Sequence, residues 1–373
     1  MVTALASLHQ DLQDLVGRTI ADRYRVDDLL GIGGMGAVFR GHHLGLERDV
    51  AIKVLHPSLS RDPDISSRFD REARSSSRLD HPNCLQVTDY GTTEHGMKFI
   101  VMQLLEGGEL GKLLGKPLPS LRAIALTLQI ARGLEHAHAQ GVIHRDIKPE
   151  NVFITRDHNG NEVLKIVDFG IAKIMGGPES RDGKAVTRAG LVFGTPAYMS
   201  PEQAAGVEAD ARSDLYSLGI LLYEMLAGRT PFQSEDPVAL VRMQVSADPP
   251  RLPQDVPPVL AAIVERSLAK ARADRFQSAK EMRETLEGVQ LLLRGDSTPS
   301  MEFPLPTASS EIRLTAGMTT MPPTRSKPIV VRPPKRRFAV GIGAAAVGLV
   351  MLWAIVPGDT EPTAQGADVA TPA

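Results

Sequence analysis

A glycine-rich run restricts the fold of this chain more than any other stretch of its sequence. Five glycines fall within the 13 residues "LLGIGGMGAVFRG" at 29–41. The segments at 23–30 and 36–43 have the residue pattern of β-strands, so the glycines connect two strands. A dinucleotide-binding fold needs a helix after such a loop, because the helix N-terminus receives the pyrophosphate. The run therefore disfavours that fold, and it leaves open a phosphate-binding loop and a plain turn.

Lys53 lies in the third predicted strand, "RDVAIKVL" at 48–55. Lysine is depleted from strand interiors, so this residue either points to water from an edge or places a cation near nucleotide phosphates. Gly31, Gly33 and Gly36 would let the backbone approach such phosphates, because they carry no side chains. A Walker A motif is excluded, since neither G-K pair in "GKLLGKP" is followed by Ser or Thr.

The charge balance excludes a generally basic chain. Lysine and arginine number 42 against 44 acidic residues, so no overall basic excess would attract nucleic acid. Cys84 is the only cysteine of the chain, which excludes an internal disulfide framework and a cysteine-based zinc cluster. Nothing around it resembles an activated thiol, so we expect a buried or half-buried structural cysteine.

The order of predicted elements indicates two lobes. A helix is predicted near 68–79, after the third strand. Two further strands, at 85–93 and 98–105, complete a small antiparallel sheet of about five strands. After Gly107 and Gly108 the apolar spacing becomes helical. Helices are predicted at 120–141, 213–226, 238–245, 258–268 and 278–293. A β-rich lobe is therefore followed by a larger helical lobe.

The two ends of the chain differ from its middle. The N-terminal extension, 1–21, opens without a basic n-region or a long apolar stretch, so it favours a short amphipathic helix over a secretory signal. Residues 293–337 are rich in Pro, Ser and Thr, carry several basic residues, and are predicted to form a disordered linker.

Residues 338–356, "FAVGIGAAAVGLVMLWAIV", contain no charge over 19 residues. A helix of this length spans roughly 28 Å, close to the hydrocarbon core of a bilayer at ~30 Å. A buried soluble helix is the alternative, but the stretch is isolated behind the linker. The preceding "KRR" predicts a cytoplasmic orientation for everything N-terminal to it and an outer tail at 357–373. We therefore expect a single-pass protein of the cell (inner) membrane, and Gly341 and Ala345 have the small-residue spacing that would suit a homodimer.

The segment "VIHRDIKPENVFI" at 142–154 decides between the remaining interpretations. Together with "VAIK" at 50–53, "DFG" at 168–170 and "GTPAYMSPEQ" at 194–203, in this order, it resembles the eukaryotic-type (Hanks-type) serine/threonine protein kinases of the bacterial branch. The resemblance covers about 24–286.

The resemblance implies an α+β, bilobal protein-kinase fold. An N-lobe at 22–104 would hold the small antiparallel sheet and one main helix, and a mainly helical C-lobe would occupy 105–292. The implied enzyme is a transferase of signal transduction, which moves the γ-phosphate of ATP to Ser or Thr hydroxyls of proteins. Magnesium is its implied cofactor, and no nucleic-acid partner is expected.

The resemblance assigns the catalytic roles residue by residue. Asp146 would accept or orient the proton of the substrate hydroxyl. Lys148 would neutralise charge that develops on the transferred phosphoryl group. Asn151 and Asp168 would supply oxygen ligands to Mg²⁺, a hard cation that prefers them.

Lys53 is expected to pair with an acidic residue on the helix after the third strand. Glu72 is the best candidate, because Asp70 and Glu106 are less suited by spacing. The residues that the resemblance places around ATP are Leu30, Gly31, Ile32, Gly33, Gly34, Met35, Gly36, Ala37, Val38, Ala51, Lys53, Glu72, Met102, Gln103 and Leu105.

Adenine would bind at the connection between the lobes. Leu30 and Val38 would enclose the ring, Met102 would line the back of the pocket, and backbone groups of Gln103 and Leu105 would face the adenine edge. Relatives usually have Glu at the position of Gln103, so a side-chain ion pair is lost there while backbone recognition remains.

The resemblance also implies regulatory residues. Arg145 has the guanidinium that could bind a phosphate bidentately. Thr195, in "GTP", would brace Asp146 and Lys148. Of the hydroxyl residues Ser180, Thr187 and Thr195, we expect Thr187 to be the main autophosphorylation site, because it lies well before the substrate-binding segment.

Two further contacts are expected to be structural. Glu202 would form an ion pair with Arg275. Asp214 would hydrogen-bond the backbone of the catalytic loop.

Three other functions stay open. A pseudokinase scaffold would bind partners without phosphotransfer, although every catalytic residue implied by the resemblance is present. A transmembrane receptor would act through an exterior domain, for which 17 residues at 357–373 are too short. A small-molecule kinase would share the fold, but "GTPAYMSPEQ" is typical of protein-directed members.

Overall fold

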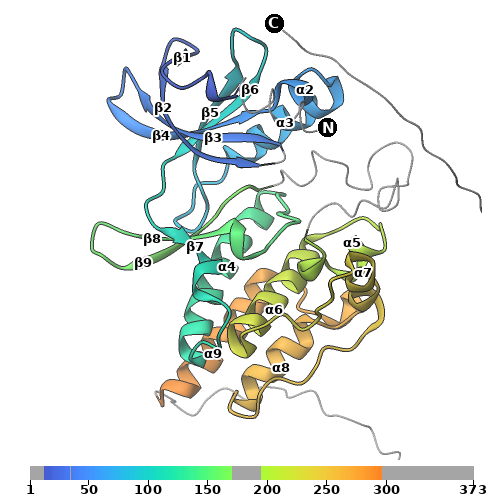
Figure 1. Ribbon diagram of the computed structural model, residues 1–373. Helices are drawn as coiled ribbons and strands as arrows, with labels where there is room; N and C mark the ends of the chain where they lie inside the picture. Colours follow the sequence, from blue (N-terminus) through green and yellow to red (C-terminus); the bar gives the residue numbers. More distant parts are fainter. Residues whose placement is uncertain (1–11, 34, 170–194, 296–373) are drawn as a thin grey trace, which may run out of the picture. The chain divides into compact units, whose positions relative to one another are not determined.

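A six-stranded antiparallel sheet forms the N-terminal part of the structure, a computed structural model that describes residues 12–33, 35–169 and 195–295 (Figure 1). The chain divides into two compact units, 1–301 and 302–373, and every described residue lies in the first. The strands follow the spatial order β1-β2-β3-β4-β6-β5. Their bounds are β1 (Thr19–Ile20), β2 (Tyr24–Gly33), β3 (Gly36–His43), β4 (Arg48–Leu55), β5 (Val87–Thr92) and β6 (Lys98–Gln103).

Alternating burial explains why these segments pair as a sheet. Phe39 of β3 and Ile52 of β4 stand opposite each other in the register, and both are fully buried. Successive side chains of a strand point to opposite faces, so one face supplies an apolar cluster. Leu12 and Leu15, from the described end of the N-terminal extension, are buried in the same cluster. This end of the extension is therefore part of the core of the N-lobe.

The strands predicted at 36–43 and 48–55 are confirmed to the residue. The first predicted strand continues past residue 30 as β2, so the glycine run forms the end of a hairpin with Gly33 opposite Gly36. The expected number of about five strands was too low, because β1 has only 2 residues. A strand that short leaves no periodic pattern in a sequence.

The helix expected near 68–79 is α3 (Pro63–Ser76), which follows a one-turn helix, α2 (Pro57–Ser60). Asp62 caps α3 by accepting two backbone N–H bonds at 3.0 and 3.1 Å. Phe69 and Ala73 are buried in a cluster that also holds residues of β4 and β6. This packing sets the position of α3 beside the sheet.

Helices dominate the remainder of the described chain. The five predicted helices are confirmed to within two residues at each end, as α4 (Ser120–Ala139), α6 (Ala211–Ala227), α7 (Pro237–Ser246), α8 (Pro258–Ser267) and α9 (Ala279–Arg294). A short helix, α5 (Pro201–Ala204), precedes α6. Sequence reasoning missed a three-stranded sheet in the order β7-β8-β9, made of β7 (Gly108–Glu109), β8 (Val152–Arg156) and β9 (Glu162–Ile166).

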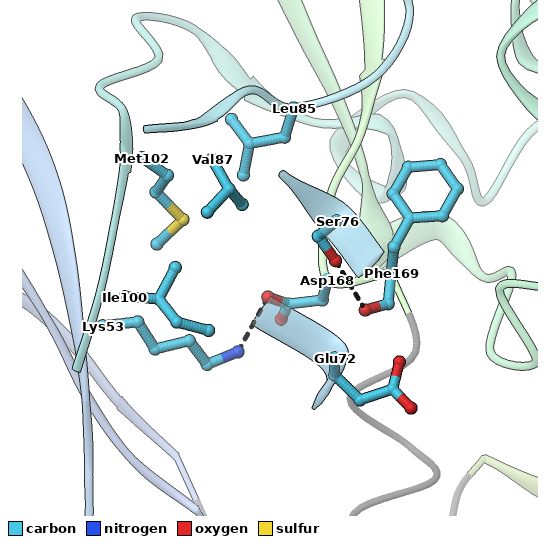
Figure 2. A pocket seen from close by; sticks show the side chains of 9 residues that line it. All are labelled: Lys53, Glu72, Ser76, Leu85, Val87, Ile100, Met102, Asp168 and Phe169. Atoms are coloured by element: carbon cyan, nitrogen blue, oxygen red, sulfur yellow. Dashed lines mark hydrogen bonds and ion pairs between the residues drawn. The ribbon is translucent and has the colours of Figure 1, made fainter. Parts of the chain in front are cut away.

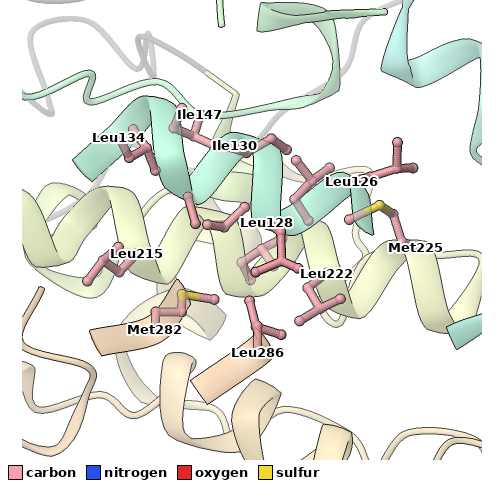
Figure 3. Close-up of a cluster of buried hydrophobic side chains, with 14 of the residues drawn as sticks. Leu126, Leu128, Ile130, Leu134, Ile147, Leu215, Leu222, Met225, Met282 and Leu286 are labelled. Atoms are coloured by element: carbon pink, nitrogen blue, oxygen red, sulfur yellow. The ribbon is translucent and has the colours of Figure 1, made fainter. Parts of the chain in front are cut away.

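The core of the C-lobe lies between α4, α6 and α9. Figure 3 shows Leu128 of α4, Leu222 of α6 and Leu286 of α9 pointing into one cluster, and all three are almost fully buried. Helix α6 is apolar around most of its surface, and 13 of its side chains are buried, from Ser213 to Leu226. A helix buried on all sides makes a fixed base for the segments that rest on it.

Several expectations concern residues outside the described ranges. They are the beginning of the N-terminal amphipathic helix, the linker beyond 295, the apolar stretch 338–356 and the tail 357–373. In the ranges that are described, no helix is both long and apolar enough to cross a membrane.

A buried ion pair between Glu202 and Arg275 links α5 to the segment before α9, which confirms the pair predicted from the sequence. Arg275 donates to both carboxylate oxygens of Glu202 at 2.8 Å, with side chains 0% and 5% exposed. Ser213 also donates to this carboxylate, at 2.5 Å. Burial on its own would raise the pKa of Glu202, but the hydrogen bonds from Arg275 and Ser213 outweigh burial and hold that pKa below its ordinary value.

We expect Glu202→Gln to lower the free energy of unfolding by about 3–5 kcal/mol at neutral pH, because it leaves Arg275 buried without its counter-charge. The folded-state pKa of Glu202 is lowered, so its stabilising contribution is complete above the ordinary Glu pKa of about 4.3 and is lost as the pH falls below it. Urea unfolding at pH 7 and at pH 3.5 should therefore show a smaller difference between variant and wild type at the lower pH.

Glu208→Gln is the matched control, because Glu208 is exposed and such substitutions usually change stability by less than about 0.5 kcal/mol. A loss at position 202 no larger than the loss at position 208 would contradict the assigned role of the pair.

Candidate active site

Polar side chains converge in the loop between α4 and β8. Lys148 Nζ lies 3.0 Å from Asp146 Oδ2, and Asn151 Nδ2 donates to the same oxygen at 2.9 Å. Lys148 also donates to Thr195 Oγ1 at 3.3 Å. Within the described ranges, no side chain or backbone group donates to Asp146 Oδ1. The loop therefore presents a carboxylate whose second oxygen is available to an incoming proton donor.

Asp214 of α6 holds the backbone of this loop, as the sequence predicted. Its Oδ2 accepts the His144 N–H at 2.8 Å, and its Oδ1 accepts the Arg145 N–H at 2.7 Å. His138 Nε2 donates to Oδ2 at 2.8 Å, and the carboxylate is 1% exposed. Burial alone would raise the pKa of Asp214, but the hydrogen bonds from the His138 side chain and the Arg145 backbone help to outweigh burial and lower the pKa.

His144 has a single tautomer that satisfies both of its ring contacts. The Asp146 N–H donates to His144 Nδ1 at 3.2 Å, so the ring proton belongs on Nε2. Nε2 then donates to the Val167 carbonyl at 2.8 Å. The neutral imidazole thus connects the loop of Asp146 with the residue that precedes Asp168. Sequence reasoning gave His144 no role, because the contact spans 23 residues.

Lys53 and Asp168 form an ion pair in the pocket behind the glycine-rich loop. Lys53 Nζ lies 2.7 Å from Asp168 Oδ1, whereas Figure 2 shows the carboxylate of Glu72 turned away from Lys53. The expected Lys53–Glu72 pair is therefore replaced by Lys53–Asp168, although Glu72 does line the same pocket. Spacing located Glu72 on the correct helix, but packing decides where its side chain points. Asp70, the weaker candidate, pairs with Lys98 at 2.8 Å.

Ser76 of α3 adds a contact that the sequence did not suggest. Its hydroxyl donates to the Phe169 carbonyl at 3.3 Å in the same pocket (Figure 2). Asp168 itself has a φ of 59°, which is uncommon for a residue other than glycine. A strained conformation of this kind persists only where surrounding contacts determine it, and it is frequent at functional sites.

The glycines of the hairpin loop serve different purposes. A Cβ at Gly36 would lie 1.9 Å from the Val54 carbonyl oxygen, so the fold itself requires glycine there. A Cβ at Gly31 or Gly33 would meet nothing within 4 Å. These two glycines keep open the space that an approaching phosphate group would need. Met35, which sequence reasoning could assign only to packing, contacts the cluster that joins β4, β6 and α3.

Several of the side chains expected around adenine gather in one apolar cluster. Ala51 and Met102 are buried in one cluster with Leu85, and Val38 and Leu105 pack against it. Leu30 and Ile32 stay outside this cluster, at 53% and 38% exposure.

The structure restricts which groups of two other expected residues could contact a nucleotide. The Gln103 N–H already donates to the Gln86 carbonyl at 3.0 Å. The backbone contact expected between Gln103 and adenine would therefore use the Gln103 carbonyl. The side chain of Ala37 is buried in the core of the sheet, so any contact of this residue with a nucleotide would use its backbone.

The donor set at Asn151 and Asp168 fits magnesium. Among the described residues, both side-chain hydrogen bonds of Asn151 use its Nδ2, which leaves the side-chain oxygen for a cation. The Val167 N–H donates to the Asn151 carbonyl at 2.9 Å, and this bond keeps Asn151 close to the residue that precedes Asp168. Mg²⁺ typically takes one or two protein oxygens and completes its octahedron with phosphates and water. The described residues contain no cluster of three His, Cys, Asp or Glu that could hold a metal by itself.

Some expected functional residues lie outside the described ranges, namely Gly34, Ser180 and Thr187. Arg145 is described and has a φ of 69° immediately before Asp146. Cys84 is buried, and burial raises the pKa of its thiol to about 12. This confirms the expectation of a structural cysteine, because a thiol that stays protonated is a poor nucleophile.

Comparison with known proteins gives consistent matches. The protein kinase domain family matches residues 24–286. Serine/threonine-protein kinase pkn3 of Myxococcus xanthus is 42% identical over 297 residues, covering 78% of this chain and 54% of that protein. Serine/threonine-protein kinase PknB of Mycolicibacterium smegmatis is 42% identical over 275 residues, covering 72% of this chain and 43% of that protein.

Two further matches come from Mycobacterium tuberculosis. Serine/threonine-protein kinase PknA is 35% identical over 376 residues, covering 93% of this chain and 84% of that protein. The crystal structure of the PknI kinase domain has a TM-score of 0.56 and 30% identity, covering 73% of this chain and 97% of that domain. The chain thus spans only about half the length of pkn3 and PknB but most of PknA.

Proposed function

The chain belongs to the protein kinase domain family, and from this premise we propose that it transfers the γ-phosphate of ATP to Ser and Thr hydroxyls of proteins. The observation that carries the proposal is the arrangement of Asp146, Lys148 and Asn151 around one carboxylate oxygen. The other oxygen of Asp146 is left for the substrate hydroxyl. A scaffold that only bound partners would have no need of this arrangement.

Each residue has a task in such a transfer. Asp146 accepts or orients the hydroxyl proton, and Lys148 places a positive charge where negative charge develops on the phosphoryl group. Magnesium, when bound with ATP, neutralises the phosphate oxygens. Asn151 and Asp168 are the residues that would hold it, and the open backbone at Gly31 and Gly33 would admit the phosphates.

The Lys53–Asp168 pair brings together two groups with different proposed tasks. Lys53 and Asp168 neutralise each other at 2.7 Å. Asp168 would serve as a ligand of magnesium, and Lys53 would contact phosphate and a second carboxylate. Glu72 lines the pocket and is that carboxylate. A rotation of the Glu72 side chain toward Lys53 would then complete the expected pair.

Protein hydroxyls are the proposed acceptors rather than small molecules. The bond between Lys148 and Thr195 joins the reaction centre to the "GTPAYMSPEQ" segment, which is typical of protein-directed kinases. The related proteins named above are serine/threonine-protein kinases, and the "KPEN" sequence at 148–151 agrees with that class.

Two further properties are proposed from the sequence. Phosphorylation of Thr187 would give Arg145 a phosphate to bind and would activate the enzyme. Residues 338–356 would anchor the chain in the inner membrane as a single helix. Basic residues flank this helix only on its N-terminal side, which would place the kinase domain in the cytoplasm. The helices of two copies would be able to pair.

For the full chain with Mg²⁺ and ATP, we expect phosphate transfer to Ser or Thr of a protein substrate such as myelin basic protein or the chain itself. Asp146→Asn should lower the rate by about 10²–10⁴-fold, because the general base is lost. Lys53→Met should lower it to a similar extent. Lys280→Met is the control, since Lys280 is 63% exposed on α9. Absence of transfer by the wild-type chain would overturn the proposed activity.

Autophosphorylation is expected at Thr187. Mass spectrometry after incubation with ATP should locate phosphate on Thr187 in wild type and not in Asp146→Asn. Thr187→Ala should lower activity toward an added substrate, because the phosphate that orders the segment through Arg145 is missing. Ser180→Ala is the matched control. Phosphate that never appears between residues 175 and 193 would contradict the assignment.

Membrane anchoring is expected to depend on residues 338–356. The full chain should remain in the membrane pellet after washing with alkaline carbonate, because a spanning helix resists extraction. A chain lacking 338–356 should move to the supernatant, while a chain lacking only 357–373 should stay in the pellet. Equal partition of the two deletions would rule out this anchor.

A further inference from the structure

The side chain of Gln203 bridges α5 and the loop of Asp146. Its Nε2 donates to the Arg145 carbonyl at 2.7 Å. Its Oε1 accepts from the Ser200 N–H at 3.1 Å and from the Ser200 hydroxyl at 2.9 Å. Both Ser200 groups are donors, so a reversed amide would set donors against donors on that side. The hydrogen bonds therefore determine which end of the amide faces Arg145.

The carbonyl that Gln203 holds belongs to the peptide group that joins Arg145 to Asp146. The N–H of the same peptide group belongs to Asp146 and donates to His144 Nδ1 at 3.2 Å. Both polar atoms of this one peptide are thus held, the carbonyl by α5 and the N–H by the loop's own His144. Since a peptide group is planar, holding both atoms fixes the position of the Asp146 Cα, from which the catalytic side chain extends.

This peptide needs external support because Arg145 is strained. Its φ of 69° lies in the left-handed region, which is costly for a residue with a side chain. Asp214 holds the Arg145 N–H at 2.7 Å but does not touch the carbonyl on the far side of the residue. Without the bond from Gln203, the peptide after Arg145 could rotate toward a relaxed conformation and carry Asp146 with it.

Buried contacts of its neighbours fix the backbone that carries Gln203. The preceding residue, Glu202, is fixed by the buried pair with Arg275 at 2.8 Å and by the Ser213 hydroxyl at 2.5 Å. Ser200 is fully buried and closes a capping box with Gln203 at the start of α5. A side chain that grows from a fixed helix can impose a position on the loop that it touches.

We propose that Gln203 is a positioning residue for the phosphate transfer, which acts on Asp146 through the Arg145–Asp146 peptide. The inference rests on the proposed kinase function. The alternative is that Gln203 serves only as the final member of the capping box and stabilises α5. The two roles use different atoms of the same amide: the donor Nε2 faces the loop, and the acceptor Oε1 faces the cap.

Gln203→Glu separates these roles. Glu is a standard capping-box residue, so its carboxylate still accepts from Ser200. Its other oxygen, however, meets the Arg145 carbonyl as an acceptor and repels it. Ser200→Ala is the converse variant, because it removes the hydroxyl of the cap and leaves the Nε2 bond to Arg145 in place.

The experiment uses the full chain with Mg²⁺-ATP and a protein substrate, at a temperature well below both melting points. For Gln203→Glu we expect kcat to fall at least tenfold, with the KM for ATP within twofold of wild type and little change in Tm. Ser200→Ala should lower Tm while kcat stays within twofold. A kcat for Gln203→Glu within twofold of wild type, or an equal loss of kcat in both variants, would overturn the proposal.

A second readout does not depend on activity. Amide hydrogen exchange of the peptides that cover 143–147 should speed up in Gln203→Glu and not in Ser200→Ala, because only the first frees the Arg145–Asp146 peptide. Unchanged exchange in Gln203→Glu would overturn the positioning role even if the wild-type chain is an active kinase. Faster exchange together with an inactive wild-type chain would support the contact and overturn the kinase function instead.

Discussion

The geometry of the site depends on one buried carboxylate, Asp214. A charge that is 1% exposed is tolerated only when donors surround it, and here the donors are His138 and two backbone N–H groups of the catalytic loop. The same backbone hydrogen bonds satisfy the buried carboxylate and hold the loop. The loop therefore cannot leave its place without exposing an unpaired charge in the core.

Helix α6 connects this anchor to a second one. Ser213 donates to Glu202 of α5, and the next residue, Asp214, accepts from the catalytic loop. Gln203 then joins α5 back to the loop at Arg145, so the contacts form a closed ring. A ring of short contacts fixes its members more firmly than a chain with a free end. This explains how a strained residue persists directly before Asp146.

Sequence reasoning succeeded where a signal is periodic or local. The strands at 36–43 and 48–55 carry regular patterns, and the helices of the C-lobe end near Gly and Pro residues. It failed for β7, β8 and β9, because strands of two to five residues give little periodic pattern. The members of the site were found from their motifs, but the choice of Asp168 over Glu72 as partner of Lys53 depends on side-chain packing.

The same limit applies to residues that act on the backbone of others. Gln203 lies 58 residues from the carbonyl that it holds, and His144 lies 23 residues from Val167. Neither contact leaves a trace in spacing or composition. A motif names the residues that touch the chemistry, whereas the residues that orient them become visible only when each backbone donor and acceptor is followed to its partner.

The glycines show how the two kinds of constraint can be told apart. Gly36 is required by the fold, because any side chain would strike the carbonyl of Val54. Gly31 and Gly33 have no such neighbour, so internal packing does not explain them. Glycine in a strand costs conformational entropy and contributes no packing. Its presence at these two open positions is consistent with the proposed approach of nucleotide phosphates to the backbone there.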